Sequence, residues 1–287
     1  MSKTTTLVQS HRSSIAHLTL NRTVWMLTAV ATLVASIAGL VRPAIYEPVV
    51  SEAIMPGVFT QDLLAAVAAA VIIILALTIG NDSAARPIII LGLLGFLFYA
   101  YGIYAIEQVY TLFYPLYLAI FALSFYGMAL GLASLQKKYW SQLSLAGWLR
   151  NGAAAYAIFV AIMFNVIWLS QLAPLLQEGN RIEYTFSIYI IDLSFIMPAM
   201  AISGILALRR HTLGIVGLPA LFILGLGILS PLALAELIKP ARYGLPTDPG
   251  GLWLFGSLSL IFLALTVLYL VQLKPTVSRR GTSQRTV

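Results

Sequence analysis

Residues 215–237 read IVGLPALFILGLGILSPLALAEL and contain one ionisable side chain, that of Glu236. A helix needs about 20 mostly apolar residues to cross the hydrocarbon core of a bilayer. In that core a helix is favoured because it pairs its own backbone N–H and C=O groups. This stretch therefore predicts a transmembrane helix.

Seven other stretches have the same character, so the sequence predicts an all-α, polytopic transmembrane bundle of about eight helices. Hydrophobic residues make up 60% of the 287, charged residues only 9%, and the mean hydropathy is +0.92. A soluble domain would carry about a quarter charged residues. The other predicted spans are Val24–Val41, Leu63–Ile79, Pro87–Ile106, Phe113–Leu135, Ala153–Leu172, Ile188–Leu208 and Leu252–Leu273.

The chain divides into an N-terminal arm (1–23), the transmembrane domain (24–273) and a basic tail (274–287). The first span is longer than the apolar region of a typical signal peptide and follows a polar arm, so we expect it to be retained. The tail is polar and basic, which is typical of disorder.

The distribution of Lys and Arg predicts that both termini lie in the cytoplasm and that the protein resides in the cell (inner) membrane. With this orientation thirteen basic residues are cytoplasmic and four face the other side. The cytoplasmic set is Lys3, Arg12, Arg22, Arg86, Lys137, Lys138, Arg150, Arg209, Arg210, Lys274, Arg279, Arg280 and Arg285, and the opposite set is Arg42, Arg181, Lys239 and Arg242.

Several function classes are disfavoured by what the sequence lacks. The absence of cysteine excludes disulfides, thiolate nucleophiles, iron–sulfur clusters and Cys-based zinc sites. His11, His17 and His211 all lie outside the apolar spans, which argues against a membrane haem and a Ser–His mechanism. No nucleotide-binding or zinc motif occurs, so neither a metal nor a catalytic residue is predicted, and any cofactor is unknown.

The net charge of +7 is dispersed over loops and tails, which fits membrane topology better than nucleic-acid binding. The expected partner is therefore the lipid bilayer. Other membrane subunits and a small-molecule or ion ligand stay open.

Four carboxylates at or inside span ends are the leading candidates for a ligand-binding or ion-coupling site. Charge burial in a membrane is costly, so such residues normally face a partner, a cavity or the interface. Asp192 is the strongest because it lies more than one helical turn inside its span, among apolar neighbours. The candidate set is Asp192, Asp62, Glu107, Glu236, Arg42 and Tyr104, with Arg42 or Arg181 as the expected basic partner of Asp192.

Each of the other three carboxylates also has a purely structural interpretation. Asp62 follows Thr60, which could cap the second span and leave Asp62 in its first turn. Glu236 has Lys239 three residues on, a plausible surface pair. Glu107 could lie in the turn between the third and fourth spans.

Tyrosines gather around the outer end of the third and fourth spans. On a continued helix, Tyr104, Glu107 and Tyr110 would share one face. An interfacial aromatic belt explains such a group, and a polar aromatic wall around a carboxylate is the alternative. The group comprises Tyr101, Tyr104, Tyr110, Tyr114 and Tyr117.

Three further patterns bear on structure. Pro198 and Pro231 interrupt the sixth and seventh spans, as in transport sites or in ordinary membrane helices. Gly127 and Gly131 form a small-xxx-small face for close packing. Residues 136–152 mix cations with aromatic residues, as expected for a short helix in the headgroup layer or a snorkelling loop.

The spacing of the acidic residues along the chain is consistent with two parallel four-helix halves, related by a pseudo-two-fold axis along the membrane normal. Asp62 and Glu107 are 45 residues apart, and Asp192 and Glu236 are 44 apart. Hairpins of similar length produce such spacings by chance, so both interpretations stay open.

Residues 114–125 (YPLYLAIFALSF) and 192–198 (DLSFIMP), the latter running on to Leu208-Arg209-Arg210, carry a resemblance over about the middle half of the chain. They resemble a group of uncharacterised prokaryotic multi-pass membrane proteins. The resemblance implies no activity, although it lends weight to Asp192 and Pro198.

Three functional hypotheses follow. The first is a carrier, channel-like or sensing protein for a cation, a proton or a small molecule, with a carboxylate-bearing site near the outer face. The second is a structural or accessory subunit of a membrane complex. An intramembrane enzyme is third, because nothing identifies a nucleophile or cofactor.

Overall fold

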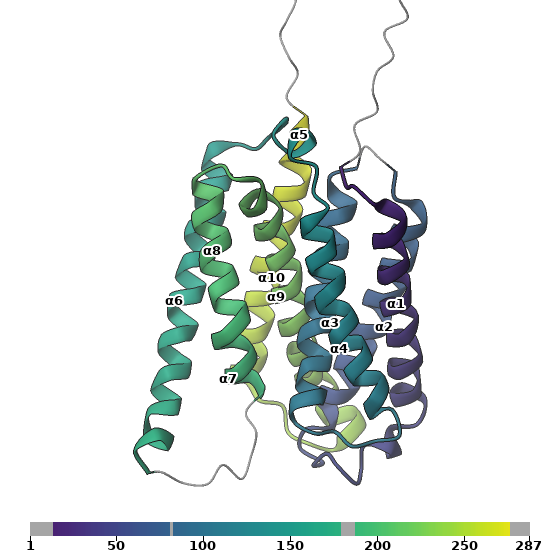
Figure 1. The fold of residues 1–287 in the computed structure, drawn as a ribbon. Helices are drawn as coiled ribbons and strands as arrows, with labels where there is room; N and C mark the ends of the chain where they lie inside the picture. Colours follow the sequence, from purple (N-terminus) through teal and green to yellow (C-terminus); the bar gives the residue numbers. More distant parts are fainter. Residues whose placement is uncertain (1–13, 81–82, 179–186, 276–287) are drawn as a thin grey trace, which may run out of the picture.

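The computed structural model describes residues 14–80, 83–178 and 187–275 and has the predicted architecture (Figure 1). Eight helices in this part of the chain are long and apolar enough to cross a membrane, so the chain is an integral multi-pass membrane protein. They are α1 (Leu18–Val41), α2 (Met55–Thr78), α3 (Ala85–Ile106), α4 (Tyr114–Ala133), α6 (Gly147–Glu178), α7–α8 (Ser187–Ile191 and Met197–Leu208), α9 (Thr212–Ile238) and α10 (Pro249–Gln272).

Most of the spanning helices begin earlier than hydropathy alone predicts, and the difference matters most in α2. This helix begins at Met55, with Pro56 in its first turn, where proline needs no N–H partner. The interpretation of Thr60 as a helix cap is therefore wrong, and Asp62 lies about two turns inside the helix rather than at its opening. Likewise α1 begins at Leu18, inside the segment assigned to the N-terminal arm.

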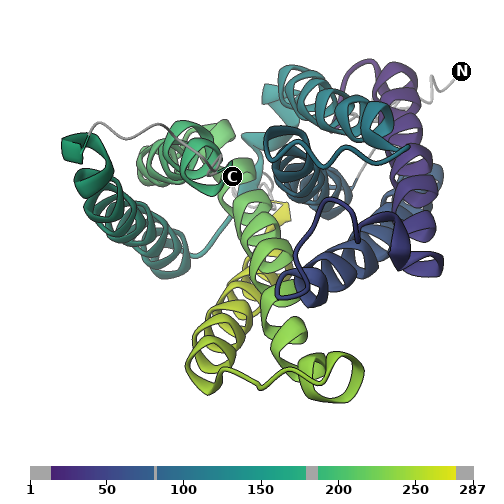
Figure 2. The ribbon, with the colours of Figure 1, turned by 90° about the horizontal axis from the view of Figure 1, so that it is seen from below.

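The centre of the molecule is the junction of α3 and α9 (Figure 2). Glycines permit this close approach: a Cβ on Gly92 would lie 2.6 Å from Ile223 Cβ, and one on Gly227 would lie 2.6 Å from the Phe96 ring. Lipid tails are as apolar as the helix side chains, so packing of this kind drives helix association in membranes. As the most buried span, α3 provides the wall against which both groups of helices pack.

The helices α1–α4 form one group and α6–α10 the other, and the pattern of helix–helix contacts within the two groups is similar. In the first, α1 packs on α2 and α4, and α3 packs on α4. In the second, α6 packs on α8 and α10 packs on α9, whereas α6 and α10 scarcely touch. The first and last helices of the first group, α1 and α4, therefore pack together, whereas those of the second group, α6 and α10, lie apart (Figure 2). The two-halves hypothesis stays a prediction.

The prolines act differently from one another. A short π-helix, η2 (Asp192–Ile196), ends two residues before Pro198, which cannot donate to the carbonyl four residues earlier. In contrast α9 runs unbroken past Pro231, which agrees with the interpretation of this proline as one tolerated in an ordinary membrane helix.

The small-xxx-small prediction is confirmed. A Cβ on Gly131 would lie 2.7 Å from Leu91 Cδ2, and one on Gly127 would lie 3.3 Å from Leu94 Cδ1. Both glycines lie against α3 and against Trp25 of α1, whose indole Nε1 donates to the Gly127 carbonyl at 3.3 Å.

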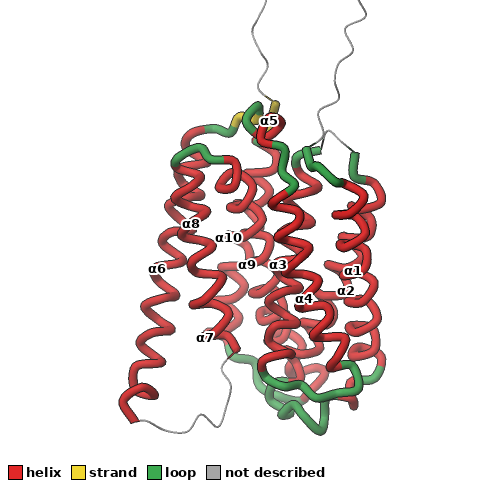
Figure 3. Tube along the Cα trace, in the orientation of Figure 1, coloured by secondary structure: helices red, strands yellow, loops and turns green. Residues whose placement is uncertain are grey.

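The connection after α4 is tied to both ends of the described chain, and its first part buries an aromatic ring that the sequence predicts to lie at the membrane interface. Only one turn, α5 (Lys137–Trp140), is helical, and Trp140 is fully buried with its Nε1 donating to the Ser14 carbonyl at 2.9 Å. Beyond it β1 (Leu143–Ser144) pairs with β2 (Lys274–Pro275), and Figure 3 shows these strands beside α5. The rest of the predicted disordered tail lies outside the described residues.

Candidate functional site

A buried carboxylate, that of Asp62, is held by tyrosines at the end of the bundle opposite α5, which the charge pattern predicts to be the outer end. Its exposed fraction is 1%. Tyr46, in the loop between α1 and α2, donates to Oδ2 at 2.7 Å, and Tyr104 of α3 donates to Oδ1 at 3.2 Å. A Cβ on Gly39 would lie 2.0 Å from Oδ2, so this glycine provides the space for the carboxylate.

Four tyrosines form a cluster around Asp62, which we call the tyrosine cluster: Tyr46, Tyr101, Tyr104 and Tyr117. Neighbouring ring centroids are 5.1–6.0 Å apart, and each side chain is at most 3% exposed. Burial, with the nearby Tyr104 and Asp62, raises the pKa of Tyr46, which keeps its hydroxyl a neutral donor. Among the described residues, no basic side chain bonds Asp62, so its charge has only neutral partners.

A chain of hydroxyl groups leads from the end of the bundle to this carboxylate. Thr111, partly exposed in the loop between α3 and α4, donates to Tyr117 Oη at 3.1 Å. Tyr117 donates to Tyr46 Oη at 3.4 Å, and Tyr46 donates to Asp62. Hydroxyl groups both donate and accept, so such a chain can pass a proton. We call it the hydroxyl chain.

Beyond Asp62, toward the α5 end, the described α1–α2 interface offers no continuation of this chain. The polar residues on that face of α1 are Thr28, Thr32 and Ser36, and each donates to a carbonyl of its own helix. The facing side of α2 carries alanines, with Ala65 and Ala69 at most 1% exposed. This part of the interface is therefore close-packed.

Asp192 occupies a different position, at the start of the π-helix. It is 6% exposed, and its Oδ2 accepts a hydrogen bond from Trp168 Nε1 of α6 at 2.8 Å; Tyr99 of α3 also bonds it. The expected partner Arg42 is exposed and is not among these contacts. Arg181, the other expected partner, lies outside the described residues.

Glu107 joins the two groups of helices. Its Oε1 accepts from the Ser187 backbone N–H at 2.7 Å, which caps the first turn of α7 from the end of α3. The helix ends at Ile106, as predicted, and Glu107 lies at the start of the turn to α4, so Tyr104, Glu107 and Tyr110 do not share a helix face; Gln108 adopts a left-handed φ of 56°. Tyr110 is 61% exposed and packs on Tyr114 instead.

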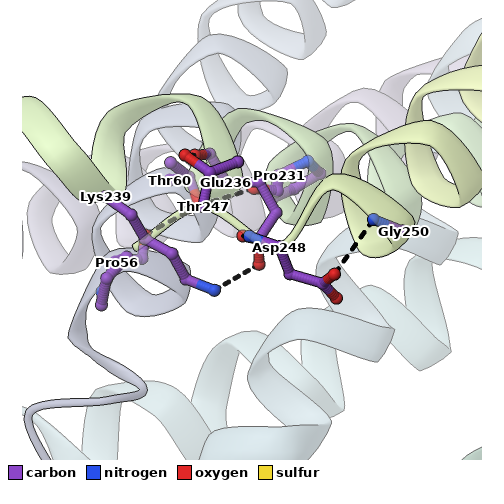
Figure 4. Close-up of polar contacts among 8 residues, drawn as sticks. All are labelled: Pro56, Thr60, Pro231, Glu236, Lys239, Thr247, Asp248 and Gly250. Carbon is purple, nitrogen blue, oxygen red and sulfur yellow. Dashed lines mark hydrogen bonds and ion pairs between the residues drawn. The ribbon is translucent and has the colours of Figure 1, made fainter. Parts of the chain in front are cut away.

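Glu236 is a structural anchor near the end of α9 (Figure 4). Its predicted pairing with Lys239 is confirmed, and its Oε2 also accepts from the Asp248 backbone N–H at 2.8 Å, just before α10. Close by, the Thr60 hydroxyl donates to the Pro231 carbonyl at 2.8 Å and joins α2 to α9. The neighbouring polar groups thus hold three helices together.

Of the six candidate residues, the structure brings Asp62 and Tyr104 together, whereas Glu107, Asp192 and Glu236 each bond other groups. Searches of protein-family models, curated proteins and solved structures each gave no match to this chain. The described residues contain no group of three or more His, Asp or Glu that could hold a metal ion. Sequence reasoning missed Tyr46, Gly39 and Thr111, because their roles depend on how the loops fold back.

Proposed function

We propose that the protein is a proton-responsive membrane protein, a carrier or a sensor, in which Asp62 takes up and releases a proton from the outer end. The observation that supports this most directly is a fully buried carboxylate at the end of the hydroxyl chain, whose partners among the described residues are all neutral hydroxyls. A carboxylate in such surroundings can alternate between protonation states, because burial disfavours its charge and hydrogen bonds favour it.

A proton suits this site better than a metal cation. A hard cation such as Ca²⁺ takes 6–8 oxygen ligands. The described residues of the site offer one carboxylate, and the Tyr46 and Tyr104 hydroxyls direct hydrogens, not lone pairs, toward it. A proton needs one oxygen atom and no additional space.

A one-sided response suits the site better than a continuous proton channel. The hydroxyl chain reaches Asp62 from the outer end, and the close-packed α1–α2 interface follows it. Protonation of Asp62 removes the charge that the Tyr46 hydroxyl stabilises, and so weakens the attachment of the α1–α2 loop. This change in the loop is the output that a carrier or sensor would use.

Asp192 is a second carboxylate that could change its protonation state. It has the same kind of neutral partners, in Trp168 and Tyr99. No hydroxyl chain from the end of the bundle leads to it among the described residues, so we place it after Asp62.

The alternative is a structural or accessory subunit, which two observations favour. Glu107 caps α7 and Glu236 bonds the backbone just before α10, so both carboxylates stabilise the fold. Under this alternative, Asp62 would only fix the α1–α2 loop.

Infrared difference spectroscopy of the purified full chain in nanodiscs, recorded between acidic and alkaline pH, separates the two functions. We expect wild type to show the C=O band of a buried carboxylic acid that appears on acidification, and Asp62→Asn to lose it. Asp192→Asn is the matched control, since it makes the same change at another buried carboxylate. A band that is unchanged in both variants, or that is absent from wild type, would favour the structural role, and loss of the band in Asp192→Asn alone would assign the response to Asp192.

A further inference from the structure

The opposite end of the bundle contains a hollow with a different chemistry. It has a volume of about 470 Å³ and lies between the α4–α6 connection and the turn from α8 to α9. Of the described residues that line it, three are cations, Lys137, Arg150 and Arg210, and none is Asp or Glu. We call it the basic pocket.

From this geometry we propose that the basic pocket binds a phosphate group carried on a larger molecule. An Arg guanidinium has a planar set of five donors that matches a phosphate, and Lys adds a compact charge. Arg150 Nε and Nη2 donate hydrogen bonds to Asn151 Oδ1 at 3.3 and 3.1 Å. These bonds hold the guanidinium in place and leave its other N–H groups for a ligand.

Two long helices add to the positive potential of the basic pocket. Gly147 begins α6 and Thr212 begins α9, and both residues line it. A helix N-terminus carries roughly half a positive charge and presents backbone N–H groups, an arrangement that favours phosphate. Here the helix ends reinforce a cavity already lined by three cations.

The turn between α8 and α9 supports a role for the Arg210 side chain. Arg210 has φ of 55°, a left-handed conformation that glycine adopts more readily. His211 follows it and also lines the basic pocket, and its Nδ1 accepts a hydrogen bond from the Leu213 N–H. An arginine at a position that favours glycine is explained if its side chain contacts a ligand.

The size and lining of the basic pocket indicate what carries the phosphate. Its volume is that of a pocket for a drug-sized molecule, larger than phosphate alone requires. Leu143, Leu145 and Ile215 contribute apolar surface beside the cations. An anionic phospholipid headgroup and a phosphorylated solute share this chemistry, and binding measurements can distinguish them.

The test is a thermal-shift titration of the full-length protein in detergent, with three probes: inorganic phosphate, short-chain phosphatidic acid and short-chain phosphatidylcholine. We expect phosphatidic acid to raise the unfolding midpoint and phosphatidylcholine to have little effect. A response to inorganic phosphate as well would indicate a soluble phosphorylated ligand, and a response to phosphatidic acid alone would indicate a lipid.

Neighbouring residues provide matched controls, because Arg209 and Lys138 are exposed but do not line the basic pocket. Arg210→Gln and Lys137→Gln should each weaken phosphatidic acid binding about fivefold, the effect of one cation near an anionic lipid. Arg209→Gln and Lys138→Gln make the same charge change and should bind as wild type. Equal weakening by all four variants, or no binding of either phosphate probe, would overturn the proposal.

Discussion

Gly39 shows how closely the site depends on one missing side chain. Its ideal Cβ position lies 2.0 Å from Asp62 Oδ2 and 2.6 Å from Tyr46 Oη, so Gly39→Ala must displace one of these groups. Overpacking of this kind costs about 1–3 kcal/mol, which we expect as a lower thermal midpoint of the purified protein. Gly57→Ala is the control, because nothing lies within 4 Å of its added methyl, and it should be neutral or slightly stabilising.

The Tyr46 hydroxyl stabilises the charged form of Asp62. Tyr46→Phe removes this donor, which should cost about 1–3 kcal/mol of stability where Asp62 is ionised. At acidic pH the protonated carboxyl needs fewer donors, so the difference from wild type should shrink as pH falls. Thermal unfolding of both proteins across pH measures this difference.

Tyr110→Phe is the matched control for this substitution, since Tyr110 is 61% exposed and lies outside the tyrosine cluster. It should follow wild type at every pH. A difference between Tyr46→Phe and wild type that stays constant, or grows on acidification, would show that Tyr46 does not stabilise a charged Asp62.

At the scale of elements, the capping of α7 by Glu107 makes one helix depend on another. Glu107→Ala leaves the Ser187 N–H without its acceptor, so the first turn of α7 should fray, at a cost of about 0.5–2 kcal/mol. Hydrogen exchange should become faster over residues 187–191. Glu52→Ala, in an exposed loop, should leave that exchange rate unchanged, and equal rates in the two variants would show that the cap contributes nothing.

The eight spans could be predicted because hydrocarbon imposes long apolar runs, but the start of α2 could not. Hydropathy ends the apolar run at Asp62, since a charge is costly in lipid. The tyrosine cluster removes that cost by tertiary packing, and the helix extends seven residues further to Met55. Pro56 was the local signal that marked the true start.

The candidate site was only partly predictable for the same reason. Asp62 and Tyr104 could be identified as polar groups at span ends, whereas the contact of Tyr46 with Asp62 depends on how the α1–α2 loop folds over the bundle. The position of Asp192 inside its span was predicted correctly. Its hydrogen bond from Trp168 joins two different helices, and such a contact cannot be predicted from the spacing of residues in the sequence.

For the whole molecule, the asymmetry of Lys and Arg predicts that the α5 end faces the cytoplasm. Single cysteines can test this, because the chain has no cysteine of its own. In intact cells an impermeant thiol reagent should label Glu52→Cys, and should label Lys138→Cys only after the membrane is permeabilised. Both positions are exposed, so the reverse pattern would invert the orientation.

The central claim is that Asp62 exchanges protons with the outer end through the hydroxyl chain. It is tested most directly by a pH jump applied to one face of oriented proteoliposomes, while the carboxylic acid band is followed by time-resolved infrared spectroscopy. We expect a response to a jump on the face that carries the α1–α2 loop, and a slower response in Tyr117→Phe, which lacks one hydroxyl of the chain. A response only to a jump on the α5 face, or an unchanged rate in Tyr117→Phe, would contradict the account.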